Sequence, residues 1–366
     1  MLDENPTSEA EGRAARAAEA AIEAALSHVS DSQPGIRRRS AGTGFFYVTP
    51  DGSKVTDPST LQRIHDIVIP PAWTDVWICA DADGHIQATG RDQRGRKQYR
   101  YHPRWLACRD EAKYSSLTEF ARALPVLRRQ VDSDLRRRSL SRERVVASVI
   151  WLLDNTLIRV GNRQYAQDNK SFGLTTLRDR HVEIEGAQLR FRFKGKSGKE
   201  WRLRLVDRRI ARIVRSVQDL PGQQLFQYLD EAGERRTVRS QDVNDYLRDA
   251  GRGAFSSKHF RTWGGTVRAA AILAETPLPE TKTGAAKALN AVVDQVAHRL
   301  GNTRSVCRNC YIHPAVVESW STGDLAQEFA ALRRTRRKTP EGLDAEETLV
   351  LRWLERRGKL AVNDAR

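Results

Sequence analysis

The spacing of apolar residues along this 366-residue chain changes near Pro103. From Ile36 to about Tyr101, short runs rich in β-branched and aromatic residues alternate with turn signals such as Asp83-Gly84, a pattern typical of antiparallel strands. After Pro103, apolar residues recur mainly at the spacing of one helix face. The sequence therefore predicts an α+β fold, with a β-rich N-terminal lobe and a mostly α-helical second lobe.

The β-rich part contains two hairpin signals and one capped helix. Asp57-Pro58 offers an N-cap followed by proline at the first helical position, which predicts a short helix ending near Ile64. The strand pairs expected on either side of it are Phe45–Val48 with Lys54–Thr56, and Asp75–Ala80 with His85–Thr89.

The first 35 residues differ from the rest in charge. They hold seven acidic and two basic residues, a net charge of −5, so the rest of the chain must carry +21 to give the total of +16. A helix there would have a mostly alanine face that buries little surface. We predict a disordered or loosely helical acidic tail over residues 1–35, a β-rich domain over 36–105 and a helical domain over 106–366. The tail is either an inert linker or a weak competitor for an anionic partner.

Caps and apolar stripes predict the helices of the second domain. The first, Leu106–Leu135, is expected to break near Ser115-Ser116 and at Pro125. Further helices are expected at 141–158, 206–217, 241–250, from Ser256 or Ser257 to about 271, at 281–300, 315–332 and 343–360.

A β segment interrupts these helices between Gly173 and Val206. It predicts a three-stranded antiparallel meander with strands His181–Ile184, Gln188–Phe193 and Trp201–Leu205. Its second turn places Lys196 between two glycines, where the side chain can reach a ligand. The plainer interpretation is an ordinary turn lysine, and Lys194 and Lys199 compete for any role.

A net charge of +16 and a pI of about 10.1 indicate an anionic partner, nucleic acid first and an anionic membrane surface second. The sequence contains no stretch of about 18 apolar residues, so it predicts no membrane span. The acidic, alanine-rich start does not resemble a secretory signal. Four cysteines in so long a chain do not form a disulfide framework, so we expect a reducing cytoplasm.

The stretch Asn302–Tyr311 follows an amphipathic helix that ends at Gly301. Its tyrosine lies among basic and polar residues. A phenol with a pKa of about 10 is a poor nucleophile at neutral pH. It can attack a phosphodiester when cations surround the phosphorus as charge builds there.

Candidate cations lie at Arg159, Lys196 and Arg261. Arg159 follows the helix that Ser141 caps, where a cation also suits the helix dipole, so a purely structural role stays open. Arg261 lies one residue from the apolar face of its helix, so we expect its guanidinium to emerge at a groove margin, with Lys258 one turn earlier on the same side.

The segment from Gly90 to His102 interleaves cations with aromatic residues. In an extended chain Tyr99 and Tyr101 share one face and Arg100 points the other way. Such a strand, with Lys97, suits contact with phosphates and packing on bases or sugars. A solvated basic edge strand is the alternative.

Taken together, these residues resemble the type IB DNA topoisomerases of the short, poxvirus-like and bacterial kind. The resemblance covers about Gly44 to Trp320. Its motifs follow one another in the order Val68-Ile69-Pro70-Pro71-Ala72-Trp73-Thr74-Asp75-Val76, Gly95-Arg96-Lys97-Gln98-Tyr99-Arg100-Tyr101, Leu157-Ile158-Arg159-Val160-Gly161-Asn162, Gly173-Leu174-Thr175-Thr176-Leu177-Arg178-Asp179-Arg180-His181-Val182, Phe193-Lys194-Gly195-Lys196 and Lys258-His259-Phe260-Arg261-Thr262-Trp263-Gly264.

This resemblance implies a mechanism. Tyr311 corresponds to the nucleophile that attacks one strand and becomes joined to the 3′-phosphate. Arg159 and Arg261 correspond to the arginines that bind the scissile phosphate, and Lys196 to the general acid that protonates the leaving 5′-oxygen. The resemblance also implies relaxation of supercoils without ATP, cofactor or metal, by a monomeric clamp on duplex DNA, located in the cytoplasm with the nucleoid.

One position departs from the poxvirus pattern. Asn302 stands nine residues before Tyr311, where the poxvirus proteins carry histidine. An amide still donates a hydrogen bond to a phosphate oxygen but brings no charge. A polar residue at a helix end is the plain alternative. Tyr165 and Lys258 join Lys97, Tyr99 and Tyr101 as expected DNA contacts.

Two other functions also fit these residues. A tyrosine recombinase uses a related set of residues, but usually with His-x-x-Arg where this chain has Lys258-His259-Phe260-Arg261, and a non-catalytic basic DNA-binding protein would form no covalent adduct. Cys307 and Cys310, with His313, form a metal site, a redox pair or, most simply, two free thiols beside the tyrosine. The basic run 333–338 is either a solvated face or a DNA-backbone contact.

Overall fold

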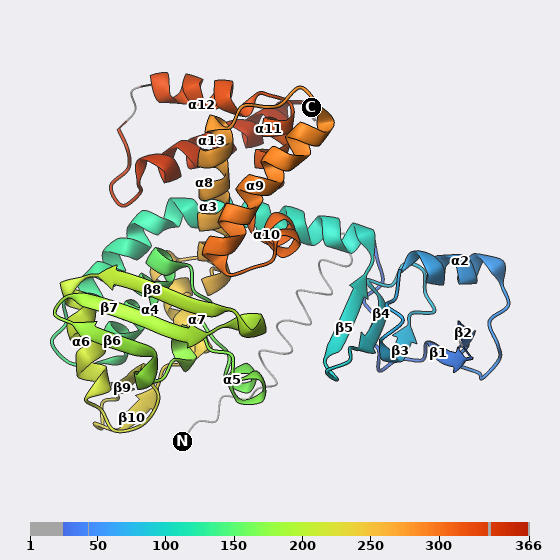
Figure 1. The fold of residues 1–366 in the computed structure, drawn as a ribbon, viewed down its shortest axis with the longest axis horizontal. Helices are drawn as coiled ribbons and strands as arrows, with labels where there is room; N and C mark the ends of the chain where they lie inside the picture. Colours follow the sequence, from blue (N-terminus) through green and yellow to red (C-terminus); the bar gives the residue numbers. More distant parts are fainter. Residues whose placement is uncertain (1–24, 43, 336–337, 365–366) are drawn as a thin grey trace. The chain divides into compact units, whose positions relative to one another are not determined.

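The computed structural model describes residues 25–42, 44–335 and 338–364 (Figure 1). The chain forms two compact units, residues 1–115 and 116–366. The expected domain boundary at residue 105 thus differs from the observed division, because helix α3 (Pro103–Leu135) runs through both positions. The content of strands and helices confirms the predicted α+β class.

An antiparallel five-stranded sheet in the order β2-β1-β3-β4-β5 forms the first unit. Helix α2 (Pro58–Asp66) begins as predicted, with the Asp57 carboxylate accepting from the Thr60 N–H. The strands are β1 (Ile36–Ala41), β2 (Gly44–Val48), β3 (Thr74–Ile78), β4 (Ile86–Arg91) and β5 (Lys97–Tyr101).

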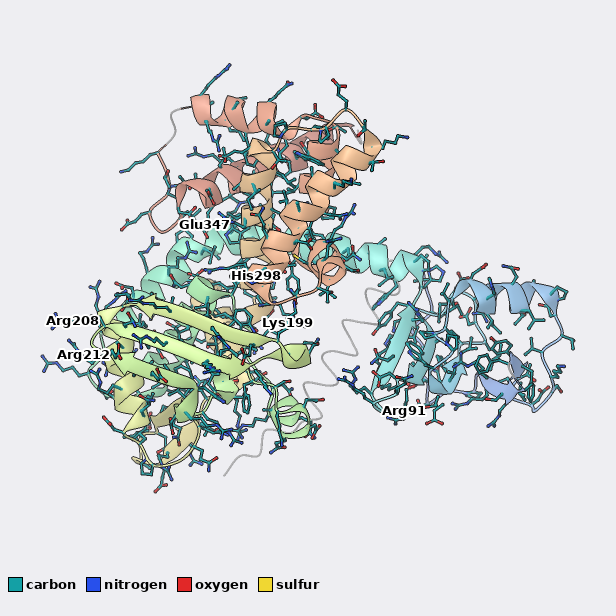
Figure 2. The ribbon with its side chains drawn as sticks, viewed as in Figure 1. Arg91, Lys199, Arg208, Arg212, His298 and Glu347 are labelled. Atoms are coloured by element: carbon teal, nitrogen blue, oxygen red, sulfur yellow. The ribbon has the colours of Figure 1, made fainter. Side chains whose placement is uncertain are left out.

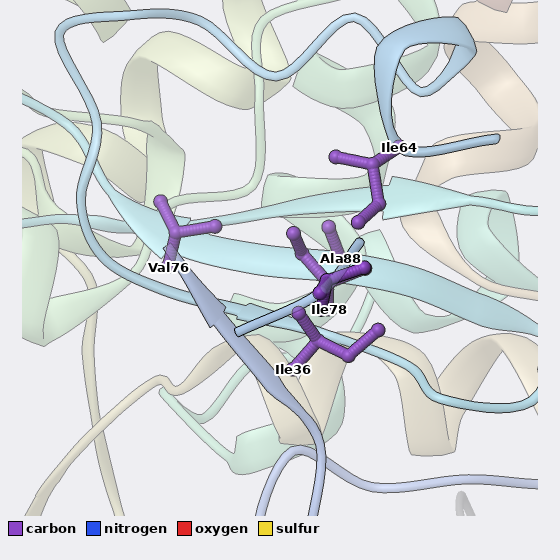
Figure 3. Close-up of a cluster of buried hydrophobic side chains, with 6 residues drawn as sticks. Ile36, Ile64, Val76, Ile78 and Ala88 are labelled. Carbon is purple, nitrogen blue, oxygen red and sulfur yellow. The ribbon is translucent and has the colours of Figure 1, made fainter. Parts of the chain in front are cut away.

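Of the two predicted hairpins, the β3–β4 pair is confirmed. The first forms in part: an isolated bridge joins Val48 to Lys54 and the Val55 N–H donates to the Tyr47 carbonyl oxygen at 2.9 Å, whereas β2 pairs along its whole length with β1. The hydrophobic core of this unit lies between the sheet and α2, which contributes Ile64 (Figure 3). Its buried side chains are Ile36, Val55, Ile64, Val76, Ile78 and Ala88.

Residues 25–35 correct the expectation of a loose tail up to residue 35. Leu26 is buried, Ser27 forms a bridge with Gly84, and the Asp31 carboxylate lies 2.6 Å from the Lys97 Nζ. The Trp77 indole also donates to the Gln33 carbonyl oxygen. The composition of the segment did not indicate this packing, because the segment is held by a few specific contacts and has no apolar stripe. Residues 1–24 of the expected tail lie outside the described part of the chain.

Helices make up most of the second unit. Beside α3 they are α4 (Arg142–Thr156), α5 (Arg163–Asn169), α6 (Arg208–Gln218), α7 (Ser240–Gly251), α8 (Ser257–Glu275), α9 (Lys282–Leu300), α10 (Arg304–Tyr311), α11 (Pro314–Ser321), α12 (Leu325–Arg334) and α13 (Ala345–Asp364). Helix α8 occupies the centre, since α4, α7 and all of α9 to α13 pack against it. No helix in the described part is long and apolar enough to cross a membrane.

The predicted three-stranded meander is confirmed as β6 (Val182–Glu185), β7 (Gln188–Lys194) and β8 (Glu200–Val206). Along β7 the residues alternate between a buried face against α6 and an exposed basic face. Short 3-10 turns occur at Leu174–Thr176, Asp179–His181 and Lys196–Gly198, and a small two-stranded sheet pairs β9 (Gln227–Leu229) with β10 (Arg235–Thr237).

Two helix predictions were wrong. Helix α3 passes through Ser115-Ser116 and Pro125 without a break. Its buried residues Leu117, Phe120, Leu124 and Leu127 surround the proline, so packing outweighs the lost hydrogen bond. The helix expected over 315–332 is instead α11 and α12, because Gly323 adopts a φ of +84° between them.

Candidate active site

Helices α8 and α10 bring Arg261 and Tyr311 together. The Cζ atom of Arg261 lies 4.9 Å from the centroid of the Tyr311 ring. The guanidinium donates to the Leu300 carbonyl oxygen at 2.8 Å and to the Leu157 carbonyl oxygen. The expectation that Arg261 emerges at a groove margin was wrong, since its side chain is only 3% exposed. Helices α9 and α10 cover that side of α8, which the helical spacing of one segment does not reveal.

Two glycines of α8 allow this close approach. A Cβ atom at Gly265 would come within 2.5 Å of the Tyr311 carbonyl oxygen, and one at Gly264 within 2.8 Å of the Leu157 side chain. Thr266 then fixes the chain after Tyr311, because its hydroxyl accepts from the His313 N–H at 3.1 Å. The nucleophile candidate is therefore anchored on its main-chain side by α8.

Arg159 follows the end of α4. Leu157 closes that helix in the left-handed region (φ 57°), as a C-cap. The Arg159 and Val160 carbonyls then accept from the N–H groups of Leu174 and Thr175, at 2.9 and 2.7 Å. A Cβ atom at Gly173 would lie 2.5 Å from the Arg159 carbonyl oxygen, which explains the glycine there. The two motifs that flank residues 163–172 thus pair with each other and hold Arg159 in place.

Asn302 lies at the turn between α9 and α10. Gly301 ends α9 with a φ of +60°, and the Asn302 Oδ1 atom accepts a hydrogen bond from Arg159. The Asn302 side chain is buried, and its Nδ2 has no partner among the described residues. The buried Nε of Arg261 is likewise unpaired within that part of the chain. Buried donors are rarely left unsatisfied, so these two could donate to a bound acceptor.

Electrostatics favour an anion here. Burial, together with the nearby charge of Arg159, lowers the pKa of Arg261 to about 10. Burial by itself raises the pKa of Tyr311, but the charges of Arg261 and Arg159 outweigh it and leave the phenol pKa lowered. An oxyanion bound between the two guanidinium groups would relieve their mutual repulsion.

Lys196 lies on the turn between β7 and β8. Ser197 and Gly198 adopt positive φ values of 62° and 75°, which make the turn tight. The Lys196 side chain is exposed and makes no hydrogen bond or ion pair within the described part of the chain. Lys199, labelled in Figure 2, lies at the end of the same turn. Its ammonium donates to the Asn302 carbonyl oxygen. The structure thus connects the turn to Asn302 through Lys199, which the sequence had suggested only as a competitor of Lys196.

The expected DNA contacts lie on separate elements. On β5, the Tyr99 and Tyr101 rings stack with centroids 5.8 Å apart, and the Lys97 ammonium lies 5.5 Å from the Tyr99 ring. Lys258 is exposed in the first turn of α8. Tyr165 belongs to α5, and its side chain lies outside what the structure describes.

The thiols near Tyr311 sit in different environments. Cys307 is buried and burial raises its pKa to about 11, whereas Cys310 is exposed. His313 caps α11, where its Nδ1 accepts from the Ala315 N–H. Across residues 25–42, 44–335 and 338–364 no three histidine, cysteine or acidic side chains gather as metal ligands. In the basic run 333–338, Arg333 lies 3.9 Å from Glu275, and residues 336 and 337 are outside the description.

Two known families match this sequence. Residues 100–336 match the family described as eukaryotic DNA topoisomerase I, catalytic core. Residues 44–92 match the family described as bacterial DNA topoisomerase IB, N-terminal domain. The first match spans the whole cluster around Tyr311.

Individual proteins are similar over most of the chain. DNA topoisomerase 1B of Acanthamoeba polyphaga mimivirus is 31% identical over 285 residues, which cover 76% of this chain and 85% of the viral protein. DNA topoisomerase 1B of vaccinia virus (strain Copenhagen) is 23% identical over 293 residues, covering 73% and 87%. DNA topoisomerase 1 of Mycosarcoma maydis is 24% identical over 185 residues, 46% of this chain and 18% of that protein.

Proposed function

This chain belongs to the type IB DNA topoisomerases, and on that premise we propose that Tyr311 is its nucleophile. As a member of that family it is an isomerase that relaxes supercoiled duplex DNA by transient cleavage of one strand. In the proposed step the Tyr311 oxygen bonds to phosphorus while the bond from phosphorus to the 5′-oxygen breaks. The phenol proton passes to water, and religation reverses the exchange.

The observation that carries this proposal is the cluster of cationic and unpaired donors beside one phenol. Arg261 and Arg159 would hold the scissile phosphate, since a planar guanidinium donates to two oxygens and keeps its charge. The unpaired Nδ2 of Asn302 would donate to a non-bridging oxygen. Charge on these oxygens increases in the phosphorane, so the same donors stabilise the transition state more than the ground state.

Lys196 would serve as the general acid. Its ammonium is exposed and unengaged within the described structure, on a turn joined through Lys199 to the Asn302 carbonyl. A proton passed from this Nζ to the 5′-oxygen would avoid an alkoxide leaving group. The amine would take the proton back when the 5′-hydroxyl attacks the phosphotyrosine.

The remaining roles concern DNA. Lys97, Tyr99 and Tyr101 on β5 would contact the duplex through phosphates and stacked rings, as would Lys258 and Tyr165. We assign DNA clamping to the β-rich unit and strand cleavage to the helical unit. A monomer that associates with the nucleoid completes the proposal.

Plasmid relaxation tests this function. Wild-type protein and Tyr311→Phe are incubated with supercoiled plasmid in EDTA without ATP, and samples are stopped with detergent. The proposal expects relaxation and a covalent protein–DNA adduct in the wild type only. Relaxation that persists in Tyr311→Phe would place the nucleophile elsewhere, and no adduct with either protein would remove the catalytic assignment.

A further inference from the structure

Lys199 engages two parts of the second unit at once. Its carbonyl oxygen accepts from the Gly195 N–H at 2.8 Å, which closes the turn that carries Lys196. Its ammonium donates to the carbonyl oxygen of Asn302, 103 residues further along the chain. One residue therefore ties the β7–β8 turn to the connection between α9 and α10.

Trp201 supports the same junction by packing. A Cβ atom at Gly195 would come within 2.6 Å of its indole nitrogen, and one at Gly301 within 2.6 Å of its Cζ2 atom. The ring is buried and stacks on Phe193, with centroids 6.1 Å apart. The indole thus fills the space between the turn and the end of α9, so the two segments are held by both a hydrogen bond and a close contact.

Asn302 connects these contacts to the cluster of Arg159, Arg261 and Tyr311. Its Oδ1 accepts from Arg159, its N–H donates to the Ala297 carbonyl at 2.9 Å, and its carbonyl accepts from Lys199. Only the buried Nδ2 is left unpaired within the described residues. The direction of that donor therefore depends on a peptide group that Lys199 holds.

We propose that Lys199 is a positioning residue that aligns the Asn302 amide with the reacting phosphate. This inference rests on the proposed function and adds a residue to it. Lys199 acts through Asn302 and not on the leaving group, because its ammonium is engaged at a main-chain carbonyl. A small misalignment of a catalytic group can cost about 10²-fold in rate.

The chemistry of the leaving group distinguishes the role of Lys196 from that of Lys199. A DNA substrate with sulfur in place of the scissile 5′-oxygen releases a thiolate, whose conjugate acid has a pKa of about 8.5, far below that of an alcohol, so its departure needs no proton. The sulfur substrate therefore restores the cleavage rate of a variant that lacks the general acid. It does not restore the rate of a variant whose oxyanion donor is misaligned.

The experiment measures single-turnover cleavage of oxygen and sulfur substrates by Lys199→Met, Lys196→Met and the control Lys194→Met. Methionine keeps the apolar stem, and Lys194 is an exposed lysine of the same hairpin. We expect Lys196→Met to recover on the sulfur substrate. Lys199→Met should stay about 10²-fold slow on both, with DNA affinity unchanged. Lys199→Arg, which keeps a cationic donor, should regain most of the rate.

Two results would overturn the inference: cleavage by Lys199→Met equal to that of Lys194→Met, or recovery of Lys199→Met on the sulfur substrate. If Lys199→Met is unfolded in a thermal melt, Lys199→Gln carries the same comparison. If the wild type forms no adduct with either substrate, the proposed function itself is contradicted. If the wild type cleaves both substrates, the variants test the role of Lys199 alone.

Discussion

The guanidinium of Arg261 lies over the ring of Tyr311, with its Cζ atom 4.9 Å from the ring centroid. The arginine also donates to the carbonyls that end α4 and α9. It therefore joins three elements at the position where the phosphate is expected. Binding of phosphate would supply the acceptor that its unpaired Nε lacks among the described residues.

Replacing Arg261 with alanine should lower the single-turnover cleavage rate far more than DNA affinity. Loss of one oxyanion donor typically costs about 10²–10³-fold in rate, whereas the duplex is bound by many other cations. Cleavage assays and equilibrium binding measure the two effects separately. Because Arg261 is buried, Arg261→Lys serves as a second variant that keeps a cation. Equal losses of cleavage and affinity would reduce Arg261 to a binding residue.

The pH dependence of cleavage should report the cations beside Tyr311. Burial raises the pKa of the phenol, but Arg261 and Arg159 lower it by more. Removing one cation disfavours the phenolate, so the pKa rises. The limb of the pH–rate profile that reflects this phenol should thus move to higher pH in Arg159→Ala. An unchanged limb, or one moved to lower pH, would show that Arg159 does not act on Tyr311.

Asn302 variants test the unpaired amide. Asn302→Ala removes the donor and should slow cleavage and religation together, by about tenfold or more. Asn302→Asp keeps the oxygen that accepts from Arg159 but turns a second acceptor toward the phosphate. The loss should therefore be greater in Asn302→Asp than in Asn302→Ala, when both rates are measured on one oligonucleotide. The opposite order would mean that the Nδ2 atom does not face the phosphate.

Asp31 should weaken DNA binding by occupying Lys97. The two charged groups lie 2.6 Å apart, and Asp31 also accepts from the Thr89 hydroxyl. Asp31→Asn frees the ammonium for a phosphate. The slope of the logarithm of the binding constant against the logarithm of salt concentration should then steepen by up to about 0.9, the full contribution of one phosphate contact, of which wild-type Lys97 makes only a part.

Lys97→Met provides the matched control for this effect. It should make the slope shallower, and the double variant Asp31→Asn, Lys97→Met should behave like Lys97→Met alone. A steeper slope in the double variant would show that Asp31 acts on something other than Lys97.

Local signals predicted much of the fold. Asp57, Ser141 and Thr281 cap α2, α4 and α9 as their side chains allow, and Asp83-Gly84 lies in the connection between β3 and β4. These features depend on a few neighbouring residues, so the sequence contains them directly.

Contacts between distant residues could not be predicted in the same way. Helical spacing placed Arg261 beside an apolar face but did not reveal that α9 and α10 bury it. The bond from Lys199 to Asn302 and the pair of Asp31 with Lys97 likewise join residues far apart in sequence. Only the resemblance to a family suggested that Arg159, Lys196, Arg261 and Tyr311 share a site. The structure brings Arg159, Arg261 and Tyr311 together around Asn302, and Lys196 remains a proposal.

The most direct test is to identify the residue that carries DNA. Wild-type protein is trapped with detergent on a cleavable duplex, digested with nuclease and protease, and analysed by tandem mass spectrometry. A nucleotide attached through its 3′-phosphate to Tyr311 is the result that we predict. Attachment to another residue, or to Tyr311 through a 5′-phosphate, would contradict the assignment of this cluster as the active site.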